Sequence, residues 1–329
     1  MSICDFSVIQ DCGINMLKSV SELFLGKNGL GRVTRANGAI CEGTFKNGLL
    51  HGTGSIIRKN GNVAIGEFDS GKLRQGKFIL KDGTIFEGTF RNGKLNGHGQ
   101  ITQSNGNTYE GTFKEEKLHG RGSVIFKNGS ITEGEFEYGK LNGQGKILHA
   151  NGNVFEGTFK NMSLNGAGKI SRADGTSFEG IFKNGDLIEG TSISNTGIIC
   201  EGTFNNGELQ DSGKTIDEDG NIKEGEFHLG YIIQGKITDI NGNIFEGEFE
   251  DGQLQGQGKT IDEDGNIKEG EFHCGDIIRG KITRSCGIIC EGSFKKNKLD
   301  GIGKYIFQNG KFVEGIFENG NFKGHINPT

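Results

Sequence analysis

The sequence predicts an all-β protein, an elongated single-sheet antiparallel β-meander assembled as a solenoid-like array of β-hairpins. The first observation is the stretch 86–106, FEGTFRNGKLNGHGQITQSNG, in which Phe, Leu, Ile and Gly occupy every second position. Such alternation is typical of strands with one buried face. The second observation is the pair Asn-Gly at 92–93 and again at 105–106, the favoured sequence of a type I′ hairpin turn. The third is that the rest of the chain repeats this hairpin.

Residues 1–25 differ from the remainder and form the first predicted domain, an N-terminal cap. Met16, Leu17, Val20, Leu23 and Phe24 fall at helical spacing, which predicts a short amphipathic helix. We expect this helix to cover the edge of the first strand. The alternative is a helix that binds a partner or dimerises the chain.

Residues 26–329 form the second predicted domain, an array of about thirteen repeats of 22–23 residues marked by the motif Glu-Gly-x-Phe and its variants. The structural repeat positions are Gly43, Phe45, Gly66, Phe68, Gly88, Phe90, Gly111, Phe113, Gly134, Phe136, Gly157, Phe159, Gly180, Phe182, Gly202, Phe204, Gly225, Phe227, Gly247, Phe249, Gly270, Phe272, Gly292, Phe294, Gly315 and Phe317. Four repeats have 22 residues, and we expect a turn or β-bulge to absorb the missing residue. A one-residue slip would otherwise turn the strand's side chains to the other face.

Glycines inside strands are costly, so the packing must require them. Phe86, Gly88 and Phe90 share one face with Leu95 and the residues that alternate after it. We expect aromatic rings to lie over glycines of neighbouring strands on this face. The opposite face is polar. Each repeat would contact only its neighbours, and so thin a sheet would not easily enclose a catalytic pocket.

Composition excludes several classes of protein. The chain has 60 Gly but 1 Pro, which excludes collagen and Pro/Gly linkers, and a net charge of −5, which gives no global attraction to nucleic acid. Seven Cys without disulfide spacing fit a reducing compartment. No signal peptide or transmembrane stretch is visible. We therefore expect a cytoplasmic protein, with peripheral association at a membrane or the cytoskeleton as a further expectation.

No motif predicts a catalytic, cofactor-binding or metal-binding residue. Residues 256–260 resemble the end of a phosphate-binding loop, but Gln253 replaces the required Gly and no helix follows. The two Asp-Glu-Asp-Gly-Asn stretches at 217–221 and 262–266 have calcium-loop composition with Gly misplaced, so we interpret them as Asp-Gly turns. Cys286 and Cys290 match no zinc spacing well. We expect no enzyme and no cofactor.

Charged residues recur on the predicted polar face. Glutamates recur on the first strand of each repeat, and lysines on the second strand are a candidate interaction face: Lys146, Lys169, Lys214, Lys259 and Lys304. As neighbours these would form Glu/Lys ladders. A charged track for a partner is one interpretation; solvated charges that keep a long sheet soluble are the other.

The segments FEGTFRNGKLNGHG, YEGTFKEEKLHGRG and FEGTFKNMSLNGAG resemble the MORN repeat, whose pattern is Y-E-G-x-W-x-x-G-x-x-H-G-x-G. The resemblance covers residues 26–326. Phe stands where that family favours Tyr and Trp, and the leading aromatic is replaced at Cys41, Cys200, Lys223, Lys268 and Cys290.

The resemblance implies a scaffold in cytoplasmic or membrane-apposed assemblies, without the junctophilin anchors, lipid-kinase domains or SET domains that accompany MORN arrays in relatives. It implies protein partners and homodimerisation, for which the C-terminal edge strand is available here. Our leading hypothesis is a non-enzymatic scaffold or spacer that mediates protein–protein interaction and self-association. The alternative is peripheral binding of anionic phospholipid membranes, which the absence of a basic cluster disfavours. We expect no nucleic-acid partner.

Overall fold

The computed structural model describes residues 27–325, and every regular element in that range is a β-strand. The chain divides into two compact units, the first ending at Ala150 and the second beginning at Asn151. The helix expected in residues 1–25 lies outside the described residues. Within these residues there is no helix that could span a membrane.

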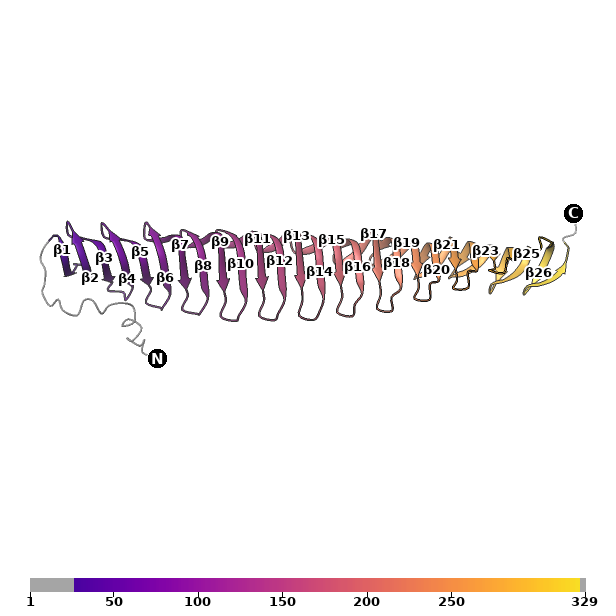
Figure 1. The fold of residues 1–329 in the computed structure, drawn as a ribbon, viewed down its shortest axis with the longest axis horizontal. Helices are drawn as coiled ribbons and strands as arrows, with labels where there is room; N and C mark the ends of the chain where they lie inside the picture. The colour runs from indigo at the N-terminus through magenta and orange to yellow at the C-terminus, as the bar shows by residue number, and fades with distance from the viewer. Residues whose placement is uncertain (1–26, 326–329) are drawn as a thin grey trace. The chain divides into compact units, whose positions relative to one another are not determined.

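Each unit is an open antiparallel meander, in which consecutive strands pair with each other (Figure 1). Unit 1 holds β1 (Gly29–Thr34), β2 (Ile40–Lys46), β3 (Leu49–Ile57), β4 (Val63–Asp69), β5 (Lys72–Ile79), β6 (Ile85–Arg91), β7 (Lys94–Thr102), β8 (Thr108–Lys114), β9 (Lys117–Ile125), β10 (Ile131–Glu137) and β11 (Lys140–Leu148). Unit 2 holds β12 (Val154–Lys160), β13 (Ser163–Ser171), β14 (Ser177–Lys183), β15 (Asp186–Ile193), β16 (Ile199–Asn205), β17 (Glu208–Ile216), β18 (Ile222–His228), β19 (Tyr231–Thr238), β20 (Ile244–Glu250), β21 (Gln253–Ile261), β22 (Ile267–His273), β23 (Asp276–Thr283), β24 (Ile289–Lys295), β25 (Lys298–Ile306), β26 (Phe312–Glu318) and β27 (Asn321–Gly324). The predicted all-β antiparallel meander is confirmed within each unit.

Two-residue turns close the hairpins at one edge of each sheet. At Asn92-Gly93, φ is 53° and 79°, positive at both residues as a type I′ turn requires. The same conformation occurs where the second residue is not glycine, as at Glu115 (51°) and Glu116 (68°). The turn prediction is therefore confirmed, and some turns adopt the conformation at a steric cost.

Replacing Glu116 by glycine should stabilise unit 1 by about 1 kcal/mol, because glycine adopts positive φ without a Cβ clash. The backbone N–H of Glu116 donates to the Leu95 carbonyl at 3.0 Å, and glycine keeps that bond. The reverse change, Gly139→Glu, is the matched control, since Gly139 occupies the same turn position and donates to Leu118. Urea unfolding should shift in opposite directions for the two variants. A loss of stability with Glu116→Gly would contradict this account of the turns.

The second strand of each hairpin contains a bulge, and the repeat length decides its size. In a 23-residue repeat, Gly88 pairs with Gly99 and Phe90 with Leu95, which leaves two extra residues on the second strand. In the 22-residue repeat of β4 and β5, the bulge holds one extra residue, Arg74. The expected absorption of the missing residue at a bulge is confirmed.

A row of glycines, here called the glycine seam, crosses each unit at the same register. In unit 1 it comprises Gly31, Gly43, Gly54, Gly66, Gly76, Gly88, Gly99, Gly111, Gly122, Gly134 and Gly145. A Cβ added at Gly111 would lie 2.5 Å from the Arg121 carbonyl oxygen, and one at Gly122 would lie 2.8 Å from Leu118 Cδ2. In unit 1, backbone and leucine atoms rather than the expected aromatic rings therefore occupy the space beside these glycines. In unit 2, the rings of Phe272 and Phe322 lie 3.4 and 2.6 Å from a Cβ added at Gly258 and Gly315, as expected.

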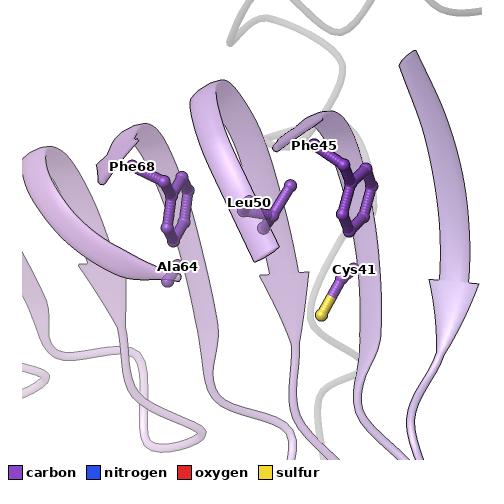
Figure 2. Packing of buried hydrophobic residues seen from close by; sticks show 5 residues of the cluster. All are labelled: Cys41, Phe45, Leu50, Ala64 and Phe68. Carbon is purple, nitrogen blue, oxygen red and sulfur yellow. The ribbon is translucent and has the colours of Figure 1, made fainter. Parts of the chain in front are cut away.

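The apolar core lies beside the seam. The Phe of every Glu-Gly-x-Phe motif is buried, and most pair in register with a Leu or Ile of the second strand, as Phe45 does with Leu50. In unit 1, Leu50 lies between the rings of Phe45 and Phe68, with Cys41 and Ala64 completing the cluster (Figure 2). Burying apolar surface between neighbouring hairpins stabilises the array.

Five-residue loops join the hairpins at the opposite edge and are tied to one another. The Asn243 side-chain oxygen accepts a hydrogen bond of 2.8 Å from the Glu263 N–H in the next loop. Asn62, Asn107 and Asn221 make the corresponding bond to the loop that follows theirs. The loops are therefore held side by side rather than left free at the sheet edge.

Candidate functional site

The two units carry opposite net charge. Residues 27–150 hold 18 Lys and Arg against 11 Asp and Glu, a formal charge of +7, whereas residues 151–329 hold 18 against 28, a charge of −10. The whole-chain value of −5 hides this separation. The separation is readable from the sequence when the charges of residues 27–150 and 151–329 are counted separately.

A hollow of about 420 Å³ opens on the apolar face of unit 1 beside β4, β5 and β6. Its lining includes the side chains of Ala64, Phe68, Phe78 and Phe90. Arg58 reaches over this floor, with its guanidinium carbon 5.2 Å from the centre of the Phe78 ring. The hollow thus combines an apolar floor with a cation at its rim.

A second hollow of about 370 Å³ shares Ile56, Arg58 and Gly71 with the first, and we call the two together the basic hollow. It adds Arg35 and Lys59 to the rim. Arg35 Nε donates to the Cys41 sulfur at 3.2 Å. Among residues 27–325, no ion pair joins Arg35, Arg58 or Lys59 to a carboxylate. Three cations without a carboxylate partner therefore line the basic hollow.

Repeat length decides whether a turn bonds to the preceding hairpin, and one part of the basic hollow lies beside a turn without that bond. After a 23-residue repeat, the next turn bonds to the preceding hairpin, as Gly71 N–H does to the Leu50 carbonyl at 2.8 Å. The turns at Gly93, Gly207, Gly252 and Asn297 follow the four short repeats, and none of them makes such a bond within the described residues. Gly93 lines the hollow. The shortened bulge of β5 therefore coincides with a gap between successive turns.

Unit 2 presents three successive loops, here called the acidic loops: 217–221 and 262–266 hold three carboxylates each, and 239–243 between them holds one, Asp239. Both Asp-Glu-Asp-Gly-Asn stretches are turns, as predicted: Asp217 N–H donates to the Asn221 carbonyl at 3.1 Å, and Gly220 N–H donates back to Asp217 at 3.0 Å. In the middle loop Ile240 takes the position held by Glu218 and Glu263, and its side chain is 69% exposed. The acidic loops therefore carry an apolar tip among carboxylates.

The lysines of the candidate interaction face lie in the expected Glu/Lys ladders. Lys169 Nζ is 2.8 Å from Glu179, Lys214 is 2.7 Å from Glu224, Lys259 is 3.3 Å from Glu269 and Lys304 is 3.8 Å from Glu314, while Lys146 pairs in register with Glu133. The hydrogen bond to Glu179 raises the pKa of Lys169. The paired charges largely compensate one another, so this face is less basic than the hollow. Its role in binding stays a prediction.

The remaining motifs do not assemble into a reactive centre within residues 27–325. Gly258 and Thr260 of the loop-like stretch lie in β21. Cys286 is exposed and Cys290 is buried, and both are free thiols. No group of three or more His, Cys, Asp or Glu side chains in the described range could hold a metal ion.

Each unit is a single-layer array of similar hairpins, which is the architecture of a repeat protein. Comparison with family models identifies the repeat: the MORN repeat matches residues 41–63, 86–108, 109–131, 133–154, 245–267 and 290–312. The chain is a MORN-repeat protein. The resemblance drawn from the sequence is confirmed.

Solved structures with some likeness include the TCP10 domain of Danio rerio CPAP in complex with a STIL peptide, at 12% identity and a TM-score of 0.18, covering 91% of this chain and 99% of that one. The Drosophila melanogaster SAS-4 TCP domain in complex with a proline-rich motif of Ana2 has 10% identity and a TM-score of 0.18, and the match covers 73% of this chain and 88% of that one. Staphylococcus aureus virginiamycin B lyase has 14% identity and a TM-score of 0.13, and the match covers 88% of this chain and 85% of that one. Likeness at this level carries no argument about function. A comparison with curated proteins finds no match.

Proposed function

We propose that this protein is a non-enzymatic scaffold that binds protein partners, and that the basic hollow is one of its binding surfaces. The observation that supports the proposal most strongly is the pair of adjoining hollows, in which the half-buried Phe78 lies under Arg58, and Arg35 and Lys59 line the second hollow without carboxylate partners. Apolar hollows with a few placed charges are the usual form of binding sites. We expect the scaffold to act in the cytoplasm, peripherally at a membrane or the cytoskeleton.

Affinity purification from cell extract tests this proposal when the wild-type chain is compared with the triple variant R35E/R58E/K59E. We expect a defined set of proteins to be enriched on the wild type and reduced at least about tenfold on the variant, because reversing rim charges opposes partner carboxylates. Circular dichroism should show the same fold for both chains. Equal recovery of the same proteins on both would contradict the hollow as a binding surface.

Binding of anionic phospholipid is the alternative function, and the charge of +7 over residues 27–150 favours it more than the whole-chain charge does. Co-sedimentation with phosphatidylserine-containing and neutral vesicles distinguishes lipid binding from protein binding. A protein scaffold stays in the supernatant with both vesicle types. Pelleting with anionic vesicles alone, reversed by salt, would favour the lipid function.

Self-association is part of the proposed function, with the C-terminal edge as one candidate contact. β27 is the last strand described, and Ile302 and Ile316, which face each other on β25 and β26, are exposed. An open strand edge beside apolar side chains is a template for pairing. Deleting residues 292–329 should then give a monomer in light scattering. A deletion variant that associates as the full chain does would remove this contact.

A further inference from the structure

Two surfaces of this chain have complementary chemistry. The basic hollow in unit 1 is concave, with an apolar floor and the cations Arg35, Arg58 and Lys59 at its rim. The acidic loops in unit 2 carry carboxylates around the exposed side chain of Ile240. Each surface therefore offers the charge and the apolar contact that the other lacks.

The acidic loops are held in a fixed arrangement. Ile240 N–H donates to the Asn221 side chain at 3.0 Å, and Glu263 N–H donates to the Asn243 side chain at 2.8 Å, so each loop is tied to the next. The Asn221 amide donates to the Asp217 carboxylate and lowers its pKa, and Asn243 does the same for Asp239. These carboxylates therefore stay ionised at neutral pH. Because the loops are already ordered, they lose little conformational entropy when they bind.

The interval between successive loops is similar on the two surfaces. The cations lie on successive loops, 35–39 and 58–62, and the carboxylates lie on successive loops built by the same hairpin repeat. Corresponding loops therefore follow one another at a similar interval, two strands at about 4.8 Å each. Opposite charges that repeat at the same interval can pair at several points at once. Such pairing fixes the alignment of the two surfaces as well as attracting them.

We propose that the acidic loops of one copy of this chain dock in the basic hollow of a second copy, with Ile240 placed against the apolar floor. The inference rests on the proposed scaffold function and names a partner for it. The contact differs from pairing at the C-terminal edge. Because every chain carries both halves, the contact can form twice in a closed pair or extend from chain to chain.

Sedimentation velocity of the purified full chain tests the proposal directly. We expect association in the micromolar range at about 50 mM NaCl that weakens at least about tenfold at 500 mM, because salt screens the charges. Ile240→Ser should weaken it without changing net charge. Ile188→Ser is the matched control, since Ile188 is also exposed in unit 2 but lies in a strand bulge, and it should leave association unchanged.

Charge reversal on each surface sharpens the test. The hollow variant R35E/R58E/K59E and the loop variant E218K/E263K/D264K should each be monomeric alone. The first variant places carboxylates on both surfaces, and the second reduces the net charge of the acidic loops from −7 to −1, which leaves the cations of the hollow almost no charge to attract. Mixed together, they should associate with each other, since each supplies what the other now lacks. Glu218, Glu263 and Asp264 are exposed and their side chains hold no hydrogen bond in the described structure, so the loop variant keeps its fold.

Several outcomes would overturn the proposal. These are a wild-type chain that stays monomeric at low salt, variants that do not associate when mixed, or association that charge reversal leaves intact and deletion of 292–329 abolishes. A monomeric chain that pellets with phosphatidylserine vesicles through the same cations would assign the hollow to lipid instead. Self-association without any partner recovered from extract would leave this contact standing and remove the wider scaffold function.

Discussion

Gly111→Ala is expected to destabilise unit 1 by at least about 3 kcal/mol, more than most single substitutions. Its φ of +144° belongs to a region that residues with a Cβ rarely adopt. The added Cβ would also lie 2.5 Å from the Arg121 carbonyl oxygen and 2.6 Å from Gly122 Cα. Both contacts are with the backbone of the paired strand, which cannot move aside without breaking the register of β8 and β9.

Gly129→Ala is the matched control for this prediction. Gly129 has φ of +87°, so alanine is also strained there, but nothing lies within 4 Å of the added Cβ. We expect a cost of about 1–2 kcal/mol from the backbone conformation alone. Urea unfolding followed by circular dichroism measures both. Equal costs at the two sites would show that close approach of the strands does not constrain the glycine seam.

Phe227→Ala is expected to cost about 3–5 kcal/mol, the range for removing a buried phenylalanine. The Phe227 side chain is 1% exposed and pairs in register with Ile232 across the hairpin of β18 and β19. A single-layer sheet has few neighbouring side chains that could move in to fill the space. Because each repeat contacts only adjacent repeats, the loss should fall on β17 to β20.

Tyr231→Ala tests whether burial causes this effect. Tyr231 lies in the same hairpin, but its side chain is 74% exposed, so we expect a change within about 0.5 kcal/mol. Thermal unfolding of the two variants gives the comparison. Similar losses for both would mean that the ring of Phe227 does not form part of a packed core.

Much of the fold could be predicted from the sequence, because the same local signals recur in every repeat. Alternation over residues 86–101 placed Phe90 and Leu95 on one face, and Asn92-Gly93 placed the turn between them. The packing beside the glycines could not be predicted in the same way. Alternation shows which residues share a face, but it does not show that paired strands approach too closely at Gly111 for any Cβ.

The basic hollow could not be predicted from the sequence. One part of the basic hollow lies beside Gly93, whose amide lacks the turn bond, and this turn follows the short repeat in which Arg74 is the one extra residue of the β5 bulge. The 22-residue interval predicted the bulge, but the gap between turns is a property of three-dimensional packing. The separation of charge between residues 27–150 and 151–329 was readable from the sequence and would have drawn attention to both surfaces.

Hydrogen exchange of the wild-type chain, resolved at single turn amides, tests most directly the claim that repeat length decides whether a turn bonds to the preceding hairpin. The amides of Gly71, Gly139, Gly185 and Gly230 bond to the preceding hairpin, so they should exchange slowly. The amides of Gly93, Gly207, Gly252 and Asn297 follow short repeats and should exchange at least about tenfold faster. Equal protection in the two groups would contradict the account.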